Sequence, residues 1–316
     1  MMIIHKKDKL PKLLIILIKN FIIISSLLLN YIFIHPYDSN IIDKINVIYT
    51  FWEPKEKIPG YIKLCIKTWE KNLPKYKINI LDYRKSKKLI GEPIFSNIVC
   101  KKMEMKIQTD AIRVAILKKY GGIWIDADTI ILNDKIIKLF QNYELSMIWE
   151  EKKKFHYIAL IYASKNSSII YEWQQNIINK VRKYNDFLLN KLNISNFKNI
   201  SIRMNTYDYL GNSIIDPIIE NITNKNKNFF HINSHLAKVL PEFFYFENTS
   251  MTKDVKYQSL YFQKRDPQLV LNYSDSIIFL HNSWTPAAYK KMSEKEFIKQ
   301  DILISKLFKK ILEINV

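Results

Sequence analysis

The chain has 316 residues, 48% of them hydrophobic, so it can bury the core of one large or two small globular domains. Lys and Arg number 49 against 30 Asp and Glu, and the net charge of +19 suggests an anionic partner: nucleic acid, lipid headgroups or a phosphorylated substrate. Cys65 and Cys100 are the only cysteines, which excludes a disulfide framework and a cysteine-rich zinc site. No zinc finger, aromatic RNA-recognition motif or compact arginine-rich run occurs, so we expect no nucleic-acid partner.

The first 40 residues differ in composition from the rest. Residues 1–12 form a basic tail, and residues 13–34 (LLIILIKNFIIISSLLLNYIFI) are long enough to cross a bilayer. This stretch exceeds the apolar core of a signal peptide and lacks a small-residue cleavage site. We therefore expect an uncleaved transmembrane signal-anchor rather than an amphipathic or buried helix. The positive-inside rule then places the N-terminus in the cytosol and residues 36–316 on the far side of the membrane.

Beyond the anchor, strand-like and helix-like segments alternate. Strands are expected at 45–51 and 77–83, and helices at 58–73 and 103–120. The second helix should end at Gly121 and Gly122, because glycine adopts the left-handed conformation that terminates helices. The alternation predicts an α/β fold with a mainly parallel sheet, in one domain that occupies residues 36–316.

Two aspartates interrupt the next apolar segment. Residues 123–132 (IWIDADTIIL) predict a strand, in which Asp126 and Asp128 would point to the same face because side chains alternate. Two neighbouring carboxylates repel and are costly to bury unless a divalent cation or a polar ligand lies beside them. The small Ala127 leaves room for such a ligand at the strand end, where open α/β sheets bind ligands. The alternative is that one aspartate merely caps the turn after the strand.

The helix before this strand adds two charged residues. Asp110 and Arg113 are three positions apart and share a helix face. They could be only a local ion pair, worth roughly a few tenths of a kcal/mol at a surface. Because the helix leads through two glycines into the aspartate segment, all four charged residues could instead line one cleft.

The pattern T-D-x-x-R-x-x-x-L-x-x-Y-G-G-I-x-x-D-x-D at residues 109–128 resembles the signature of glycosyltransferase family 32. That family includes capsular-polysaccharide-synthesis glycosyltransferases and Golgi α-mannosyltransferases. The resemblance begins near VIYTFWEP (47–54) and ends near HNSWTP (281–286), so it spans most of the region after the anchor. It implies a GT-A fold, a Rossmann-like α/β domain that binds a nucleotide-diphospho-sugar.

The resemblance also implies roles for single residues. Asp126 and Asp128, the DXD motif, would be catalytic. Asp128 would bind Mn²⁺ or Mg²⁺ directly, Asp126 would help to position the metal, and His281 would complete the metal site. Two carboxylates and an imidazole suit Mn²⁺ well. The residues that would bind the nucleotide-sugar donor are Trp52, which would pack on the base, Asp110, Arg113, Ser283 and Trp284.

The implied activity is the transfer of a sugar from a UDP- or GDP-linked donor to a glycan or glycolipid acceptor, with retention of anomeric configuration. A divalent cation on the diphosphate would stabilise the leaving group as a Lewis acid. Two alternatives remain: a catalytically inactive glycosyltransferase-like membrane scaffold, and a metal-dependent phosphotransferase. The second lacks a phosphate-cradling GxxxxGK loop. Residues 205–219 depart from the family's Gly-Pro acceptor loop by carrying Gly211, Asn212 and Ser213, so acceptor roles there, including one for Asp216, are left open.

The expected topology predicts different compartments for different sources. The chain would be a single-pass membrane protein of the Golgi or endoplasmic reticulum if eukaryotic, and of the inner membrane if bacterial. Asn-x-Ser/Thr sequons agree with a lumenal domain, although an Asn-rich chain produces several by chance. The sequons start at Asn166, Asn193, Asn199, Asn221, Asn248 and Asn272.

Overall fold

The computed structural model describes residues 46–151, 153–190, 208–223, 229–233, 251–274 and 276–314, all within one compact unit, Lys44–Val316. The predicted basic tail and anchor, residues 1–12 and 13–34, lie outside the described residues. Within the described ranges, no helix combines the length and the apolar character that a membrane crossing requires.

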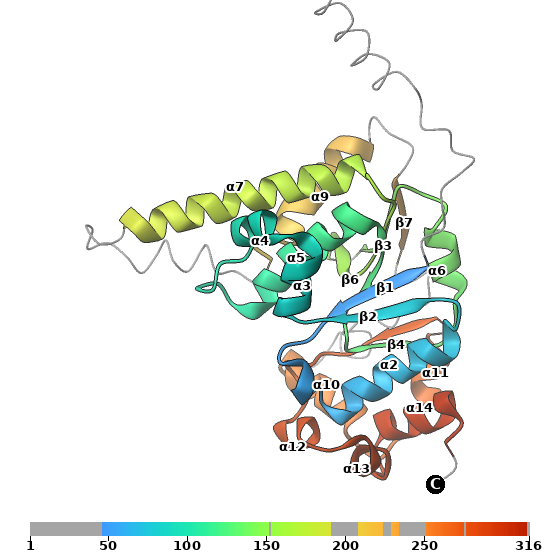
Figure 1. Ribbon diagram of the computed structural model, residues 1–316. Helices are drawn as coiled ribbons and strands as arrows, with labels where there is room; N and C mark the ends of the chain where they lie inside the picture. The colour runs from blue at the N-terminus through green and yellow to red at the C-terminus, as the bar shows by residue number, and fades with distance from the viewer. Residues whose placement is uncertain are drawn as a thin grey trace, which may run out of the picture. The chain divides into compact units, whose positions relative to one another are not determined.

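Among the residues that the structure describes, six strands form a mixed sheet in the order β2-β1-β3-β6-β5-β7 (Figure 1). They are β1 (Val47–Phe51), β2 (Lys77–Leu81), β3 (Gly122–Ile125), β5 (Leu145–Glu150), β6 (Phe155–Ala163) and β7 (Phe229–Asn233). Strand β1 is parallel to β2 and β3, and β5 is parallel to β7. Strand β6 runs against both of its neighbours. The predicted α/β class is confirmed, but β6 makes the sheet more mixed than expected.

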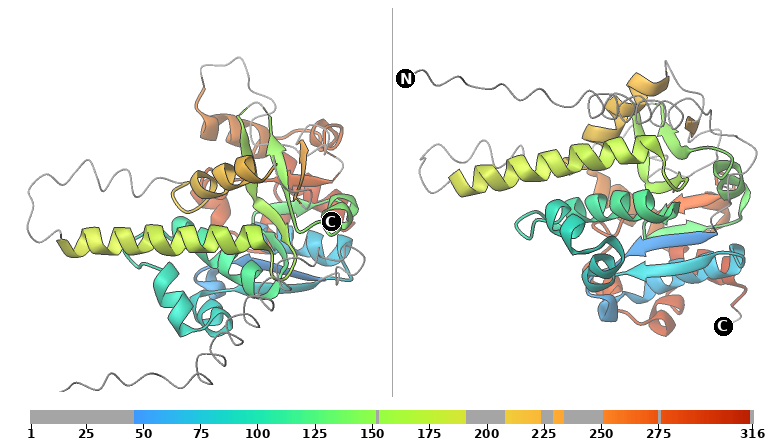
Figure 2. Two further views of the ribbon diagram at one scale, coloured as in Figure 1. Left: turned by 90° about the horizontal axis from the view of Figure 1, so that it is seen from above. Right: turned by 45° about the horizontal axis from the view of Figure 1, so that its top comes forward.

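Helices cover both faces of the sheet (Figures 1 and 2). One face carries α3 (Tyr83–Ile90), α4 (Glu92–Ile98), α5 (Met105–Tyr120), α7 (Ser168–Asn190) and α9 (Asn212–Thr223). The other carries α2 (Gly60–Asn72), α6 (Lys135–Phe140), α10 (Lys253–Tyr261), α11 (Gln268–Leu271), α12 (Ala287–Lys290), α13 (Glu294–Ile298) and α14 (Leu303–Leu312).

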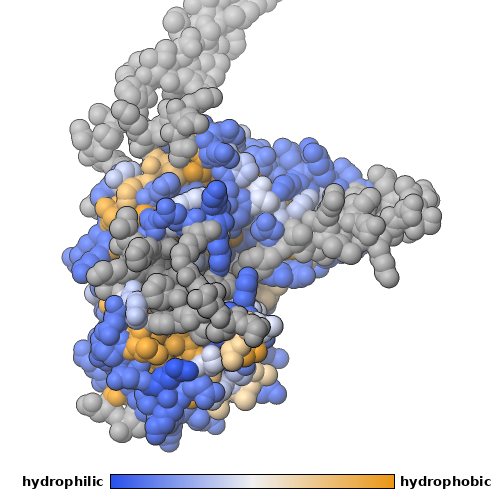
Figure 3. All heavy atoms as spheres, turned by 180° about the vertical axis from the view of Figure 1, so that it is seen from behind, coloured by the Kyte–Doolittle hydropathy of each residue, from blue (hydrophilic) through white to orange (hydrophobic). Residues whose placement is uncertain are grey.

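In the described part of the chain the core consists of two apolar clusters, one on each side of the sheet. Alternation along the strands assigns neighbouring residues to opposite clusters. Ile48 packs toward α2 and α14, whereas Tyr49 packs toward α5 and α7. Likewise, Ile123 belongs to the same cluster as Ile48, and Trp124 to the same cluster as Tyr49. Hydrophilic side chains predominate on the face drawn in Figure 3, as expected for a chain with a net charge of +19.

Helix α5 ends where the glycine pair predicted it would. Gly121 has a φ of 65° and Gly122 a φ of 105°, a region that side chains with a Cβ rarely adopt. Gly121 N donates to Leu117 O and closes the last turn. The chain then enters β3 immediately, which fixes the end of α5 beside the first strand of the aspartate segment.

The strand predicted at 123–132 is divided in two. Strand β3 ends at Ile125, and a turn follows in which Thr129 N donates to Asp126 O at 3.1 Å. The chain then forms β4 (Thr129–Ile131), which pairs with β8 (Ile277–Phe279) in a separate two-stranded sheet. The prediction of one continuous strand is wrong, because β4 finds its partner in a segment almost 150 residues away. Aspartate also favours turns.

Candidate functional site

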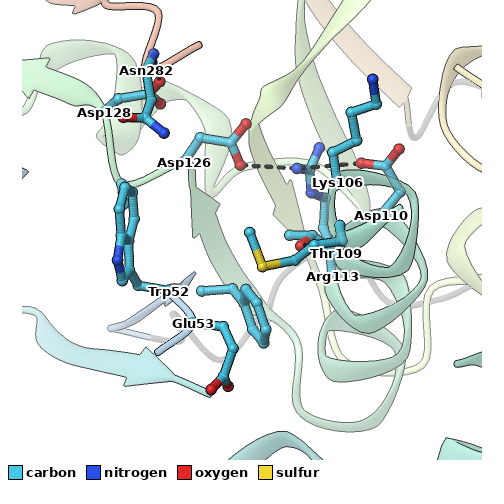
Figure 4. A pocket seen from close by; sticks show the side chains of 12 residues that line it. Trp52, Glu53, Lys106, Thr109, Asp110, Arg113, Asp126, Asp128 and Asn282 are labelled. Carbon is cyan, nitrogen blue, oxygen red and sulfur yellow. Dashed lines mark hydrogen bonds and ion pairs between the residues drawn. The ribbon is translucent and has the colours of Figure 1, made fainter. Parts of the chain in front are cut away.

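Strands β1 and β3 are parallel neighbours, so their carboxyl ends meet at one edge of the sheet. Trp52 follows β1, Asp126 follows β3, and α5 brings Asp110 and Arg113 to the same edge (Figure 4). These side chains surround a cavity of about 200 Å³. Its lining consists of Phe51, Trp52, Glu53, Met105, Lys106, Thr109, Asp110, Arg113, Asp126, Ala127, Asp128 and Asn282.

A second, larger cavity of about 540 Å³ adjoins the first. The two share four lining residues: Lys106, Asp126, Asp128 and Asn282. The larger cavity is also lined by Phe155, Tyr157, Ile158, Ala159, Asn212, Lys253, Phe279, Leu280, His281, Ser283 and Trp284. Every site residue predicted from the sequence therefore lines one of these two cavities or both.

Arg113 is the central cation of the smaller cavity. It is 3% exposed, and its Nη2 lies 2.8 Å from Asp126 Oδ1 and 3.4 Å from Asp110 Oδ1. Its Nη1 donates to the backbone oxygen of Ile158, and the guanidinium lies 5.1 Å from the centre of the Trp124 ring. Arg113 thus ties α5 to the turn after β3 and to β6, which exceeds the local ion pair considered from sequence.

The two aspartates of the DXD motif face different partners. Asp126 Oδ1 accepts hydrogen bonds from Arg113 Nη2 and from Trp124 Nε1, the latter at 2.7 Å. Asp128 instead lies beside Asn282 (Figure 4), and its Oδ2 accepts a hydrogen bond from Asn282 N at 2.8 Å. These residues form a turn and not the expected strand, yet both carboxylates line both cavities.

Asp128 occupies a site that disfavours its charge. Burial, and then the negative charge of Asp126, raise the pKa of Asp128 to about 6, although the hydrogen bond from Asn282 N acts in the opposite direction. Strands β4 and β8 position this side chain, since Leu280 N donates to Asp128 O at 2.9 Å. A nearby cation would stabilise the ionised carboxylate.

His281 directly precedes Asn282, the residue whose backbone nitrogen donates to Asp128. Its ring stacks on Trp284 with centroids 3.6 Å apart, and its Nδ1 is 3.1 Å from Ser283 Oγ. The backbone nitrogen of His281 donates to the hydroxyl of the buried Tyr257. His281 shares the larger cavity with Asp126 and Asp128. Across the part of the chain that the structure describes, however, no three His, Cys, Asp or Glu side chains gather closely enough to hold a metal ion.

Asp110 provides a pH-dependent prediction. Burial raises its pKa to about 7, Arg113 opposes that rise, and Asp126 adds to it. An unfolded aspartate has a pKa of about 3.9, so between about pH 4 and 7 the folded state binds more protons, and stability falls as pH rises. Asp110→Asn cannot ionise and should escape this loss. At pH 8 the variant should be more stable than the wild type, by at most roughly 4 kcal/mol.

Urea denaturation at pH 4, 6 and 8 checks this expectation. Asp186→Asn, an exposed substitution on α7, serves as the control and should follow the wild-type pH dependence. Identical pH dependence in Asp110→Asn and the wild type would show that folding does not raise the pKa of Asp110.

Sequence reasoning missed several residues of the site. Asn282 stands inside the HNSW motif but received no role, although it contacts Asp128 and lines both cavities. Lys106 precedes Asp110 by four positions, one helical turn, and this spacing could have placed it at the same edge. The indole of Trp124 as a donor to Asp126 became visible only once the turn was known.

The match to a family model identifies this protein as a glycosyltransferase similar to those of family 32, and the α/β fold agrees with that class. The family described as "Capsular polysaccharide synthesis protein" matches residues 19–270, and the chain belongs to that family. The match ends before His281, Ser283 and Trp284.

Two solved structures resemble the chain. One is "PaToxG Glycosyltransferase", with 19% identity and a TM-score of 0.37, covering 58% of this chain and 71% of that one. The other is mouse xyloside xylosyltransferase 1 in its apo form, with 10% identity and a TM-score of 0.39, covering 76% of this chain and 98% of that one. A search of curated proteins gave no match.

Proposed function

We propose that this glycosyltransferase has a GT-A organisation and moves a sugar from a UDP- or GDP-linked donor to a glycan or glycolipid acceptor, with a divalent cation and with retention of configuration. The observation that supports the proposal best is the placement of Trp52, Arg113 and the Asp126–Asp128 turn around one cavity. An indole offers a stacking surface for a base, and the carboxylates offer acceptors for ribose or sugar hydroxyls.

The chemistry of the DXD turn fits a hard divalent cation. Carboxylate oxygens are preferred ligands of Mg²⁺ and Mn²⁺, and the raised pKa of Asp128 reflects a charge without adequate compensation. Asp128 would be the principal ligand. Asp126 Oδ1 is engaged by Arg113 and Trp124, so Asp126 would contribute through Oδ2. His281, which lines the larger cavity, would be a further ligand of the cation. When bound, the cation would stabilise the departing diphosphate as a Lewis acid.

The protein's own groups would orient the donor. Arg113 is committed to Asp110 and Asp126, so its task is to hold these carboxylates in place for hydroxyl groups. Lys106 lines both cavities and supplies positive charge near the expected diphosphate. The acceptor would enter the larger cavity, where Phe155 and Trp284 offer apolar surface for a sugar ring. Retention with the departing phosphate as proton acceptor requires no side-chain base, and we assign none.

A donor screen tests the proposal. The purified full-length chain is incubated with a panel of UDP- and GDP-sugars and Mn²⁺, and nucleotide release is measured. We expect hydrolysis of at least one donor and its loss after chelation. Equal hydrolysis with chelator would contradict the metal role. A folded protein without activity would favour the scaffold, and phosphoryl transfer from a nucleoside triphosphate would favour the phosphotransferase.

Trp52→Ala should weaken binding of the donor and of the matching free nucleoside diphosphate to a similar degree. Loss of base stacking costs roughly 1–3 kcal/mol, which corresponds to about 5- to 150-fold in affinity. Trp52→Phe retains an aromatic face and should lose much less. Calorimetric titration with the free nucleotide provides the measurement. Unchanged nucleotide affinity in Trp52→Ala would show that the base does not stack on Trp52.

The proposal also includes membrane attachment through residues 13–34, with the N-terminus cytosolic and the catalytic unit in a Golgi or endoplasmic reticulum lumen or outside a bacterial inner membrane. The composition of these residues is its support. Release of the full-length chain from membranes by alkaline carbonate would rule out a spanning anchor.

A further inference from the structure

The start of α9 packs directly against the candidate donor site. A Cβ on Gly211 would lie 2.7 Å from Ile158 Cδ1 and 3.1 Å from Asp110 Oδ2, so the backbone here approaches the carboxylate as closely as glycine allows. The next residue, Asn212, begins the helix and lines the larger cavity together with Asp126 and Asp128. The first turn of α9 therefore forms part of the cavity wall.

The orientation of the Asn212 amide is fixed by its neighbours. Its Nδ2 donates to the backbone oxygen of His156 at 2.7 Å and to Asp216 Oδ2 at 3.1 Å. Both partners are acceptors, so the amide nitrogen and not the amide oxygen must face them. Both hydrogens of Nδ2 are thereby used. What Asn212 can offer a ligand in the cavity is its oxygen, Oδ1, as a hydrogen-bond acceptor.

A buried histidine contacts the other carboxylate oxygen of Asp216. His156 is 3% exposed, and its Nδ1 lies 2.7 Å from Asp216 Oδ1, while its ring packs on Trp149 with centroids 4.6 Å apart. Within the described residues, His156 Nε2 has no hydrogen-bond partner, so Asp216 is the polar contact of this ring. The two oxygens of Asp216 are then divided between His156 and Asn212. These contacts fix the orientation of the Asn212 side chain.

We propose that Asn212 Oδ1 accepts a hydrogen bond from a sugar hydroxyl in the larger cavity, and that Asp216, itself held by His156, is a positioning residue for Asn212. The inference rests on the proposed function, because it takes the ligand to be a sugar. The hydroxyl belongs either to the transferred sugar or to the acceptor. An amide oxygen suits both, since a hydroxyl donates one hydrogen to it without a change of charge.

The test compares full-length wild-type, Asn212→Ala, Asn212→Ser and Asp216→Ala chains in donor binding, donor hydrolysis and sugar transfer. Loss of one neutral hydrogen bond predicts about a 10-fold effect. If the hydroxyl is on the donor, Asn212→Ala weakens sugar-nucleotide binding but leaves affinity for the free nucleotide unchanged. If it is on the acceptor, donor binding and hydrolysis persist while the KM for the acceptor rises. Asn176→Ala, an exposed substitution on α7, is the control and should match the wild type.

The positioning role of Asp216 has its own readout. If Asp216 acts through Asn212, the Asn212→Ala/Asp216→Ala double variant should be no worse than Asn212→Ala, whereas independent roles give additive losses. Asp216→Asn can still accept from Asn212 and should retain most activity. Wild-type values for Asn212→Ala and Asn212→Ser in all three assays would overturn this inference and leave the proposed function unaffected. A wild type that binds and turns over no sugar nucleotide overturns the proposed function and this inference with it.

Discussion

Asp128→Asn is expected to lower sugar-nucleotide turnover by about 1000-fold or more while the fold survives. Removing a metal ligand forfeits most of the leaving-group stabilisation that a divalent cation provides, typically several kcal/mol. The fold should survive because an Asn oxygen can still accept the hydrogen bond from Asn282 N. Stability at pH 8 should be equal to or above that of the wild type, since the pKa of Asp128 is raised to about 6 and Asn removes the cost of its charge.

Three measurements check this expectation: turnover with Mn²⁺, the thermal unfolding midpoint, and the dependence of turnover on metal concentration. Asp186→Asn on α7 is the matched control and should behave like the wild type. An Asp128→Asn variant with wild-type turnover would refute the metal role of Asp128. A variant that fails to fold would show that the carboxylate is needed for the β4–β8 connection itself.

Arg113→Met is expected to destabilise the protein by about 3–5 kcal/mol at pH 8, the cost of leaving a buried charge without its partner. Asp110 and Asp126 would lose the cation that lies between them, and the Ile158 carbonyl would lose its donor. The loss should be smaller at pH 5, because Asp110, with its pKa of about 7, is already protonated there and loses no charge partner when Arg113 is removed.

Urea denaturation at pH 5 and pH 8 measures the effect, with Arg182→Met, an exposed change on α7, as the control. Arg113→Lys keeps the charge but cannot reach two carboxylates and a carbonyl at once, so it should fall between the wild type and Arg113→Met. Asp110→Asn combined with Arg113→Met should be less destabilised than the sum of the two changes predicts. Equal stability of Arg113→Met and Arg182→Met at pH 8 would mean that water, not Arg113, compensates these carboxylates.

The elements nearest the motif were the most predictable. Helix α5 and its end at Gly121 follow from apolar spacing and from the one residue type that tolerates a positive φ. Strands β1 and β2 follow from short β-branched runs between turn residues. The turn at Asp126–Asp128 was missed because the flanking residues are as apolar as a continuous strand. Nothing local distinguishes a strand that continues from one that changes sheets.

The residues around Asp128 depended on contacts across the whole chain. Asn282 reaches Asp128 through the pairing of β4 with β8, and Tyr61 of α2 donates to the Asn282 side chain. Asn212, His156 and Asp216 meet because α9 packs on β6. No spacing rule joins these positions, since strand pairing and helix packing are chosen by burial over the entire domain.

The sequence by itself determined the class of this protein, the α/β alternation and the identity of the charged residues at the carboxyl edge of β1 and β3. These depend on periodicity and on residue chemistry over short distances along the chain. Only the tertiary structure decided which carboxylate faces Arg113, which faces Asn282, and which amide oxygen is left for a ligand. Those outcomes depend on where buried polar groups find partners, and the partners come from segments far apart in the chain.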